Sequence, residues 1–405
     1  FGIRANIGLV VMEFPSNYAN DPQEYLNKGF EFRDNWRNNK LISTSIAPHA
    51  PYSVSNSTFE LINTYAEQLN LTIHTHLHET RNEIEESIKQ FSSTPIERLS
   101  ELGLLGPKLM AAHCVHLSEN DMYQLKSNGV SVLCNISSNM KLGSGFVDVY
   151  KLINNNINIA IGTDSSASNN RLDMFSEMRS MALNNKALTM KSEFLKPSEV
   201  IKMATINGAK ALGLDHITGS IVKNKYADII AVNLDRIDTQ PCYDPLASLV
   251  YCADRTSVEY VWINGDTKLK ERVLVNIDEN ENLNKKILLI NKSIKEINFA
   301  QTALAYSISD TANKGGKLGW ISESILSEQI YKKIKKLKIG EHTNPILVPG
   351  GFLILKILDF KEVNKEFDIK NEVKKIINEK TNQQLNRFSN IYFNKIKKDI
   401  KINEF

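Results

Sequence analysis

Histidine and aspartate side chains recur where predicted strands end in the first part of the chain. His49, His76, His113 and Asp164 each stand at or near the carboxyl end of a β-rich run. Imidazoles and a carboxylate that converge on one point are the ligand types of a hydrolytic Zn²⁺ or Fe²⁺ site, where the ion lowers the pKa of bound water to about 7. A single histidine at a strand end is more often structural. Four such strand ends in succession predict a metal-dependent hydrolytic site.

The segment LTIHTHLHET carries the densest group of these residues. His74, His76 and His78 alternate along the strand, which places them on one face of a regular strand. Glu79 follows at its end, where a carboxylate can pass a proton during catalysis. His116 and His216 fall outside the register of strand ends, and we expect them to be structural or exposed.

The elements that must position these side chains alternate between β-rich and helical runs. Strand-like segments such as LISTSIAPH are followed by helical ones such as STFELINTYAEQL, and the alternation continues to about residue 212. This order predicts a parallel α/β sheet or barrel, in which active sites gather at the carboxyl ends of the strands. Short β-rich pieces follow, and after about Lys270 the composition shifts to Lys, Asn and Ile. We therefore expect three parts, residues 1–215, 216–270 and 271–405.

Composition excludes several classes of function. The 405 residues contain 49 Lys and Arg against 46 Asp and Glu, a balance that does not predict a nucleic-acid partner. The four cysteines show no Cys-x-x-Cys spacing, which favours reduced thiols and a reducing compartment. No apolar run reaches the roughly 18–20 residues of a membrane span. The chain opens on Phe1 within a strand-like run, so we expect its natural start to lie upstream.

Five motifs, taken in order, resemble the amidohydrolase superfamily and, within it, the methylthioadenosine/S-adenosylhomocysteine deaminase type. They are HLHET, AAHCVHL, CNISSNMKLGSG, GTDSSASNN and MATINGAKALG, and the resemblance covers about residues 1–267. It implies an α/β fold, an incomplete TIM barrel with a partial β-sandwich subdomain, and a divalent metal cofactor, zinc or else iron. It also implies a set of roles: metal ligands His76, His113 and Asp164, catalytic groups Glu79, His113 and Asp164, and substrate contacts His49, Ser168 and Arg4.

The same resemblance implies an aminohydrolase for a small nucleoside such as 5-methylthioadenosine or S-adenosylhomocysteine. Metal-bound hydroxide would add to C6 of the adenine ring, with Glu79 and Asp164 relaying protons while ammonia leaves. Guanine or cytosine deamination and a chlorohydrolase-like reaction are alternatives with the same metal chemistry. Members of this type also carry a His-x-His pair on a first barrel strand. This sequence shows no such pair upstream of its first strand, and we therefore expect an impaired metal site.

The rest of the chain resembles a parvulin-type peptidyl-prolyl isomerase domain of SurA-like chaperones. The matching pieces are YSISDTA, GGKLGW, LKIGEHTNPI and GGFLILKI, with VLVNI from Val273 as the first strand of an α+β domain and a long helix at the end of the chain. Asn276 and Leu353 stand where the resemblance implies histidines, so binding of unfolded peptide is expected rather than isomerisation. A peptide-binding chaperone module joined to an inactive barrel fragment is thus the alternative to an enzyme. The front part resembles cytoplasmic proteins and the rear part periplasmic ones, so we expect pieces of two genes to join near Lys270.

Overall fold

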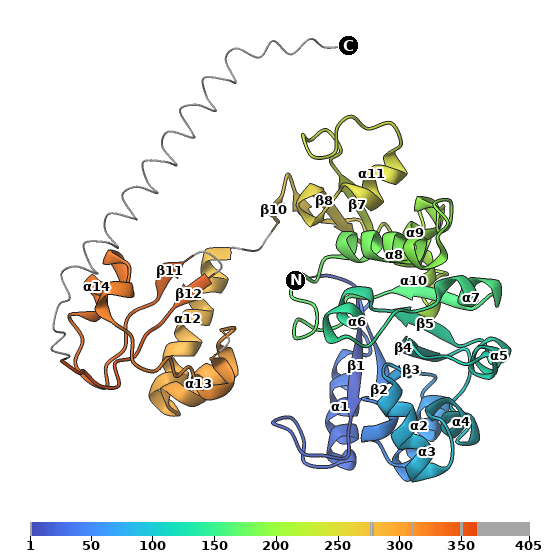
Figure 1. Cartoon of the computed structure of the whole chain (residues 1–405), viewed down its shortest axis with the longest axis horizontal. Helices are drawn as coiled ribbons and strands as arrows, with labels where there is room; N and C mark the ends of the chain where they lie inside the picture. The colour runs from blue at the N-terminus through green and yellow to red at the C-terminus, as the bar shows by residue number, and fades with distance from the viewer. Residues whose placement is uncertain (1, 276, 278, 310, 349–350, 363–405) are drawn as a thin grey trace, which may run out of the picture. The chain divides into compact units, whose positions relative to one another are not determined.

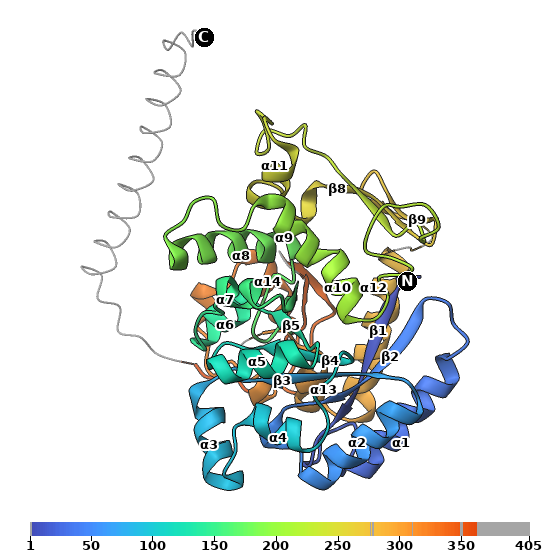
Figure 2. The same ribbon diagram turned by 90° about the vertical axis from the view of Figure 1, so that its right-hand side faces the viewer.

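The computed structural model describes residues 2–275, 277, 279–309, 311–348 and 351–362. The chain divides into two compact units, Phe1–Glu279 and Asn280–Phe405 (Figures 1 and 2). Within the described residues, no helix is both long enough and apolar enough to cross a membrane. The side chains predicted to hold a metal all belong to the first unit.

A six-stranded parallel sheet forms the centre of the first unit. Its strands follow one another in chain order, and the blue-to-green ribbon in Figure 1 shows the first five of them. They are β1 (Ala5–Val11), β2 (Ile42–Pro48), β3 (Thr72–Leu77), β4 (Leu109–His113), β5 (Ser131–Cys134) and β6 (Asn158–Ile161). A sequential order without reversal is typical of a (β/α) barrel wall rather than of a doubly wound sheet. The predicted parallel α/β architecture is confirmed, and within the described residues β1 and β6 form the two edges of the sheet.

Helices connect these strands, and most of them begin at a side-chain cap. They are α1 (Pro22–Trp36), α2 (Asn56–Gln68), α3 (Arg81–Phe91), α4 (Pro95–Glu101), α5 (Glu119–Ser127), α6 (Ile136–Leu142) and α7 (Val149–Asn154). A helix leaves its first amide groups unpaired, and a polar side chain just before it can accept from one of them. The first five helices have such caps, namely Asp21, Ser55, Thr80, Thr94 and Ser118.

Buried aliphatic side chains hold the sheet against its helices. Val11, Ile46, Leu77 and Val132 come from β1, β2, β3 and β5, and each is completely buried in one continuous apolar core. Strands of a covered parallel sheet are expected to be apolar in this way. The polar residues at the strand ends therefore stand on a densely packed frame.

Helices and a smaller sheet follow β6. The helices are α8 (Met174–Thr189), α9 (Pro197–Ala204) and α10 (Ile206–Ala211), and the last two pack against β6. The antiparallel sheet has the order β10-β9-β8-β7 and contains β7 (Ile229–Val232), β8 (Val258–Ile263), β9 (Asp266–Lys270) and β10 (Val273–Leu274), with α11 (Pro245–Tyr251) between β7 and β8. This sheet corresponds to the small β subdomain predicted from the sequence.

The structure corrects the prediction for Val273. We expected it to open the first strand of the rear domain, but Val273 and Leu274 pair with Lys270 and Leu269 in the small sheet of the first unit. The two residues between the strands, Glu271 and Arg272, have φ values of 48° and 66°. Positive φ at both central residues is typical of the tight turns that join hairpin strands, so the chain folds back on β9 at this point.

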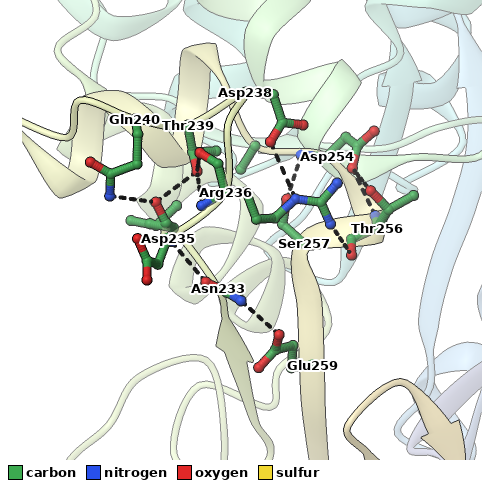
Figure 3. A network of polar contacts seen from close by, with 12 residues as sticks. Asn233, Asp235, Arg236, Asp238, Thr239, Gln240, Asp254, Thr256, Ser257 and Glu259 are labelled. Carbon is green, nitrogen blue, oxygen red and sulfur yellow. Dashed lines mark hydrogen bonds and ion pairs between the residues drawn. The ribbon is translucent and has the colours of Figure 1, made fainter.

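Two loops beside the small sheet are joined by a network of hydrogen bonds (Figure 3). Arg236 follows β7 and donates to the carbonyl of Thr256 at 2.9 Å, and it also pairs with Asp238 at 3.2 Å. Asn233 donates to the carboxylate of Glu259 on β8 at 2.7 Å. These contacts fix the loop after β7 to the start of β8.

The second unit combines helices with a short antiparallel pair of strands. Its elements include α12 (Glu279–Glu296), α13 (Phe299–Tyr306), α14 (Glu328–Ile334), β11 (Ile346–Val348) and β12 (Gly351–Leu353). The combination agrees with the expected α+β class. The long helix predicted for the end of the chain lies outside the described residues, and so does Asn276.

Candidate metal centre

Three predicted ligands meet at the carboxyl edge of the parallel sheet. His76 lies in β3, His113 ends β4, and Asp164 follows β6 by three residues. Because neighbouring parallel strands end at the same edge, these side chains can converge although they are far apart in sequence. One ligand atom from each residue lies within 4.8 Å of the other two. The structure thus brings together the three residues that the sequence predicted as ligands.

The chemical state of these groups suits a divalent cation. Burial lowers the pKa of His76 to about 4, with smaller contributions from the neighbouring His113 and His49, so its imidazole is neutral at pH 7. Burial alone would raise the pKa of Asp164, but hydrogen bonds from Ser138, Ser168 and Ser165 outweigh it and lower the pKa. Two imidazoles and an ionised carboxylate form a donor set that fits zinc.

Asp164 is held by serine side chains on both sides of it along the chain. Its Oδ2 accepts from Ser138 Oγ at 2.6 Å and from Ser168 Oγ at 2.7 Å, while Oδ1 accepts from the amide of Ser165 at 2.7 Å. The backbone of Asp164 has a φ of 61°, an uncommon value for a residue other than glycine. The carboxylate is therefore fixed at the strand end by several contacts at once.

Glu79 lies next to the three ligands and has its own support. Its Oε1 accepts from Ser144 Oγ at 3.0 Å, and its Oε2 lies 3.8 Å from Nε2 of His113. The backbone that carries Glu79 is clamped by Glu83 at the start of α3. The two carboxylate oxygens of Glu83 accept from the amides of His78 and Glu79 at 3.1 and 2.8 Å. This clamp sets the direction in which Glu79 leaves β3.

Two of the three predicted substrate contacts lie beside the ligands. The ring of His49 is centred 5.0 Å from that of His76, and its Nδ1 lies 2.9 Å from Ser53 Oγ. Burial lowers the pKa of His49, so this ring is also uncharged at neutral pH. Ser168 is buried, and its hydroxyl already donates to Asp164. The contact shown for Ser168 is therefore with the candidate ligand.

Arg4 is not part of this group. It precedes β1, at the opposite end of the strand from the ligands, and its guanidinium donates to both carboxylate oxygens of Asp228 at 2.5 and 3.3 Å. It also donates to the carbonyl of Lys40 at 3.0 Å and lies over the ring of Tyr226. Because its donors are engaged by these partners, this placement argues against the predicted contact of Arg4 with a substrate carboxylate.

Three further histidines of the first unit, His78, His116 and His216, have structural surroundings or are exposed. His78 does not share the face of His74 and His76, because the chain turns after Leu77 and His78 takes a φ of 51°. Its fully buried ring contacts the carbonyl of His116 through Nδ1 at 2.9 Å. The ring of His116 in turn contacts the carbonyl of Ser144 at 2.8 Å, and His216 is exposed.

Sequence reasoning noticed polar residues up to Ser138 at the end of this strand but assigned no role to the residues that support the site. Ser138, Asn139 and Ser144 contact Asp164, His113 and Glu79 in that order. All three belong to the motif CNISSNMKLGSG, which starts at the end of β5 between the strands that carry His113 and Asp164. Short polar side chains directly after a buried strand were the available signal. The partner of each one follows only from the packing.

Two family models match the chain. Residues 1–268 match the amidohydrolase family, and residues 268–359 match the PPIC-type PPIase domain. Both resemblances inferred from the motifs are confirmed by these matches. The two matches meet close to the predicted junction near Lys270.

Individual relatives match part of this chain and not the whole of it. A 5-methylthioadenosine/S-adenosylhomocysteine deaminase of Teredinibacter turnerae is 40% identical over 283 residues, which are 69% of this chain and 63% of that protein. A 5'-deoxyadenosine deaminase of Methanosphaera stadtmanae is 42% identical over 243 residues, 60% of this chain and 57% of the relative. The crystal structure of an adenosine deaminase from Xanthomonas campestris with bound zinc has a TM-score of 0.69 and 40% identity, covering 72% of this chain and 66% of the other. The chain spans less than two thirds of the length of these relatives.

Proposed function

Because the chain belongs to the amidohydrolase family, we propose that its first unit is a metal-dependent aminohydrolase that releases ammonia from an adenine nucleoside. The observation that carries this proposal is the convergence of His76, His113 and Asp164 at the ends of three strands. Relatives named as deaminases of 5-methylthioadenosine, S-adenosylhomocysteine and 5'-deoxyadenosine support the substrate class.

Zinc is the cofactor that the donor set and the zinc-bound adenosine deaminase structure support best. When bound, the ion lowers the pKa of a water molecule to about 7, which supplies hydroxide at neutral pH. His76 and His113 would hold it through ring nitrogens and Asp164 through a carboxylate oxygen. Iron is the alternative, and elemental analysis separates the two metals.

The residues around the ligands can move the protons that the reaction requires. The ionised carboxylate of Asp164 accepts a proton as water attacks C6 of the adenine ring. Glu79, whose Oε2 lies 3.8 Å from His113 Nε2, delivers a proton to the amino nitrogen. A C–O bond forms at C6, the C–N bond breaks, and ammonia leaves with the 6-oxo purine as product. His49, next to His76, would contact the nucleoside.

The expected impairment of the metal site stays a prediction. The described cluster supplies three ligands, and many catalytic zinc sites use three protein ligands and leave the fourth position to water. Ligand number alone therefore does not decide between a weak site and a working one. The affinity for zinc decides it, because weak binding would leave the site empty at micromolar zinc.

The test is zinc binding and ammonia release by the purified full chain. Metal-free protein is titrated with zinc. Ammonia release is then measured with 5-methylthioadenosine, guanine and cytosine as separate substrates, and chloride release with a chlorinated triazine. If the site is impaired as expected, zinc binds weakly and the adenosine analogue is turned over slowly, and both are lost in His76→Asn. His216→Asn, at an exposed histidine, is the matched control. Zinc binding that is unchanged in His76→Asn would overturn the assignment of the site.

A groove in the second unit supports a second function, binding of unfolded peptide. The groove has a volume of about 720 Å³ and is lined by apolar side chains including Phe299, Trp320, Ile330, Tyr331 and Leu355. The match to the PPIC-type PPIase domain covers these residues. Large accessible apolar surfaces usually mark binding sites. Binding of a labelled unfolded peptide, measured by fluorescence anisotropy, tests this function, and no binding at high micromolar protein would contradict it.

A further inference from the structure

His113 has one side-chain hydrogen-bond partner outside the ligand group, and that partner is Asn139. Nδ1 of His113 lies 2.7 Å from Oδ1 of Asn139, a residue of α6 that is 1% exposed. An amide oxygen can only accept a hydrogen bond, so Nδ1 of the imidazole must carry the proton. A neutral imidazole has a single N–H, and Nε2 therefore keeps a free lone pair.

In the side-chain amide of Asn139, the oxygen has a hydrogen-bond partner within the described part of the chain and the nitrogen does not. Its Nδ2 is buried and has no hydrogen-bond partner among the described residues. A buried unpaired donor costs stability, and an orphan of this kind requires an explanation. Turning the amide by 180° would still leave one buried atom without a hydrogen-bond partner, because Oδ1 would then occupy the position that Nδ2 has now. The two orientations differ in the state they impose on His113.

With the amide turned, the proton and the lone pair of the His113 ring would exchange places. Nδ2 would donate to Nδ1, the proton would move to Nε2, and Nε2 would have no lone pair for a cation. Nε2 is the nitrogen that faces Glu79, at 3.8 Å from Oε2. The orientation with Oδ1 toward Nδ1 is thus the one that makes His113 an electron-pair donor toward the cluster of His76 and Asp164.

We propose that Asn139 is a positioning residue that fixes the tautomer of His113 so that Nε2 offers its lone pair to the cluster. The assignment of the tautomer is independent of the proposed function, whereas the assignment of the lone pair to a metal rests on it. It also refines the role of His113, because a neutral ring in this tautomer cannot donate a hydrogen bond from Nε2 to a substrate. His113 therefore acts as ligand or proton acceptor. Metal-binding histidines commonly have their tautomer set by such a partner on the second nitrogen.

The place of Asn139 in the fold explains how one residue can do this. Helix α6 starts directly after β5, and β5 lies between β4 and β6 in the sheet. The segment can therefore reach His113 at the end of β4 and Asp164 after β6. Ser138 and Asn139, adjacent in sequence, contact these two residues separately.

The tautomer of His113 can be measured directly in metal-free protein. The full chain is labelled with ¹⁵N-histidine, and long-range ¹H–¹⁵N correlation spectra distinguish protonated from unprotonated ring nitrogens. We expect a protonated Nδ1 and an unprotonated Nε2 in the wild type. Asn139→Leu, which removes the acceptor, should move the proton to Nε2. Asn139→Asp keeps an acceptor oxygen and should retain the wild-type pattern.

Zinc affinity provides the second measurement, by competition with a chromophoric chelator. We expect Asn139→Leu to weaken zinc binding by roughly 10–100-fold, as is typical for losing the outer partner of a ligand. Asn184→Leu is the matched control, because Asn184 also has one buried unpaired amide atom but contacts Met140 instead of a ligand.

The outcomes separate this inference from the proposed function. A wild-type spectrum with the proton on Nε2, or a tautomer that stays the same in Asn139→Leu, would overturn the inference. The first of these needs no variant, so a variant that fails to fold does not prevent the test. A protonated Nδ1 together with absent zinc binding would support the inference and count against the metal site.

Discussion

The candidate metal centre is made of buried and half-buried polar side chains, whereas the groove of the second unit is made of half-buried and exposed apolar ones. His113 is 1% exposed, and Asp164 accepts three hydrogen bonds. In the groove, Trp320 is 66% exposed and Phe360 55%. A cation and a developing charge need dipoles that are fixed before they arrive, while an extended peptide needs apolar surface that it can reach. Each region is built for its own class of ligand.

The comparison between the two regions fails if zinc binding does not need the carboxylate of Asp164. Asp164→Asn keeps the size of the side chain but removes the charge that faces the cation. We expect zinc affinity to fall by more than the roughly 10–100-fold that losing an outer partner costs. Chelator competition measures this, with the exposed Asp235→Asn as control. Equal zinc affinity in Asp164→Asn and wild type would show that the carboxylate is not a ligand.

Glu79 tests whether proton transfer can be separated from metal binding in the same site. Glu79→Gln should lower the rate of ammonia release by about 10²–10⁴-fold, the usual contribution of a general acid–base group. Zinc affinity should stay close to that of the wild type, because Glu79 is not one of the three converging residues. The exposed Glu85→Gln is the control on the following helix. A parallel loss of zinc would instead make Glu79 a ligand.

The groove should lose affinity when its exposed aromatic side chain is removed. Trp320→Ala is expected to weaken binding of an unfolded peptide by roughly 30-fold, corresponding to about 2 kcal/mol for an aromatic side chain at the centre of an interface. Ile325→Ala is the matched control, because Ile325 is 78% exposed in the same unit but does not line the groove. Similar losses in both variants would mean that the peptide does not bind in the groove.

The sequence was sufficient to predict the parallel sheet of the first unit and its three candidate metal ligands. Alternating β-rich and helical runs predicted the parallel sheet, and His76, His113 and Asp164 were recognisable because strand ends of such a sheet share one edge. It was not sufficient for contacts that depend on a turn. The hairpin at Glu271 and Arg272 redirects Val273 into the small sheet, and no pattern of apolar residues encodes that choice.

The contacts that support the site could not be predicted from the sequence for a related reason. Glu83 looks in the sequence like one of several acidic residues of an exposed helix, since Glu85 and Glu86 follow it. Only the position of α3 relative to the end of β3 shows that Glu83 is buried beneath the backbone of Glu79. Helical periodicity indicates which residues share a face, but it does not indicate which backbone groups that face will meet.

The smallest expected effect is that of a substitution at Glu83, and it is a change in the free energy of unfolding. Glu83→Gln replaces one accepting oxygen with an amide nitrogen that cannot accept, so the amide of His78 or Glu79 loses its partner. Leaving a buried donor unpaired typically costs about 1–3 kcal/mol in the free energy of unfolding. Urea unfolding of the full chain measures this. Glu85→Gln should change the same quantity by less than about 0.5 kcal/mol, as is usual for surface substitutions.

The pH dependence of this difference tests the burial of Glu83 itself. Burial raises the pKa of Glu83 from 4.5 to about 7, although hydrogen bonds from the amides of Glu79 and His78 act in the opposite direction. Between these two pH values the folded protein keeps a proton that the unfolded chain has released, so stability falls as pH rises through the window. Glu83→Gln lacks this proton, and the stability advantage of the wild type over the variant should shrink from pH 4.5 to pH 7. An advantage that grows over the same range would mean that the carboxylate is stabilised in its charged form, and the clamp on the backbone of Glu79 would then be stronger than its burial implies.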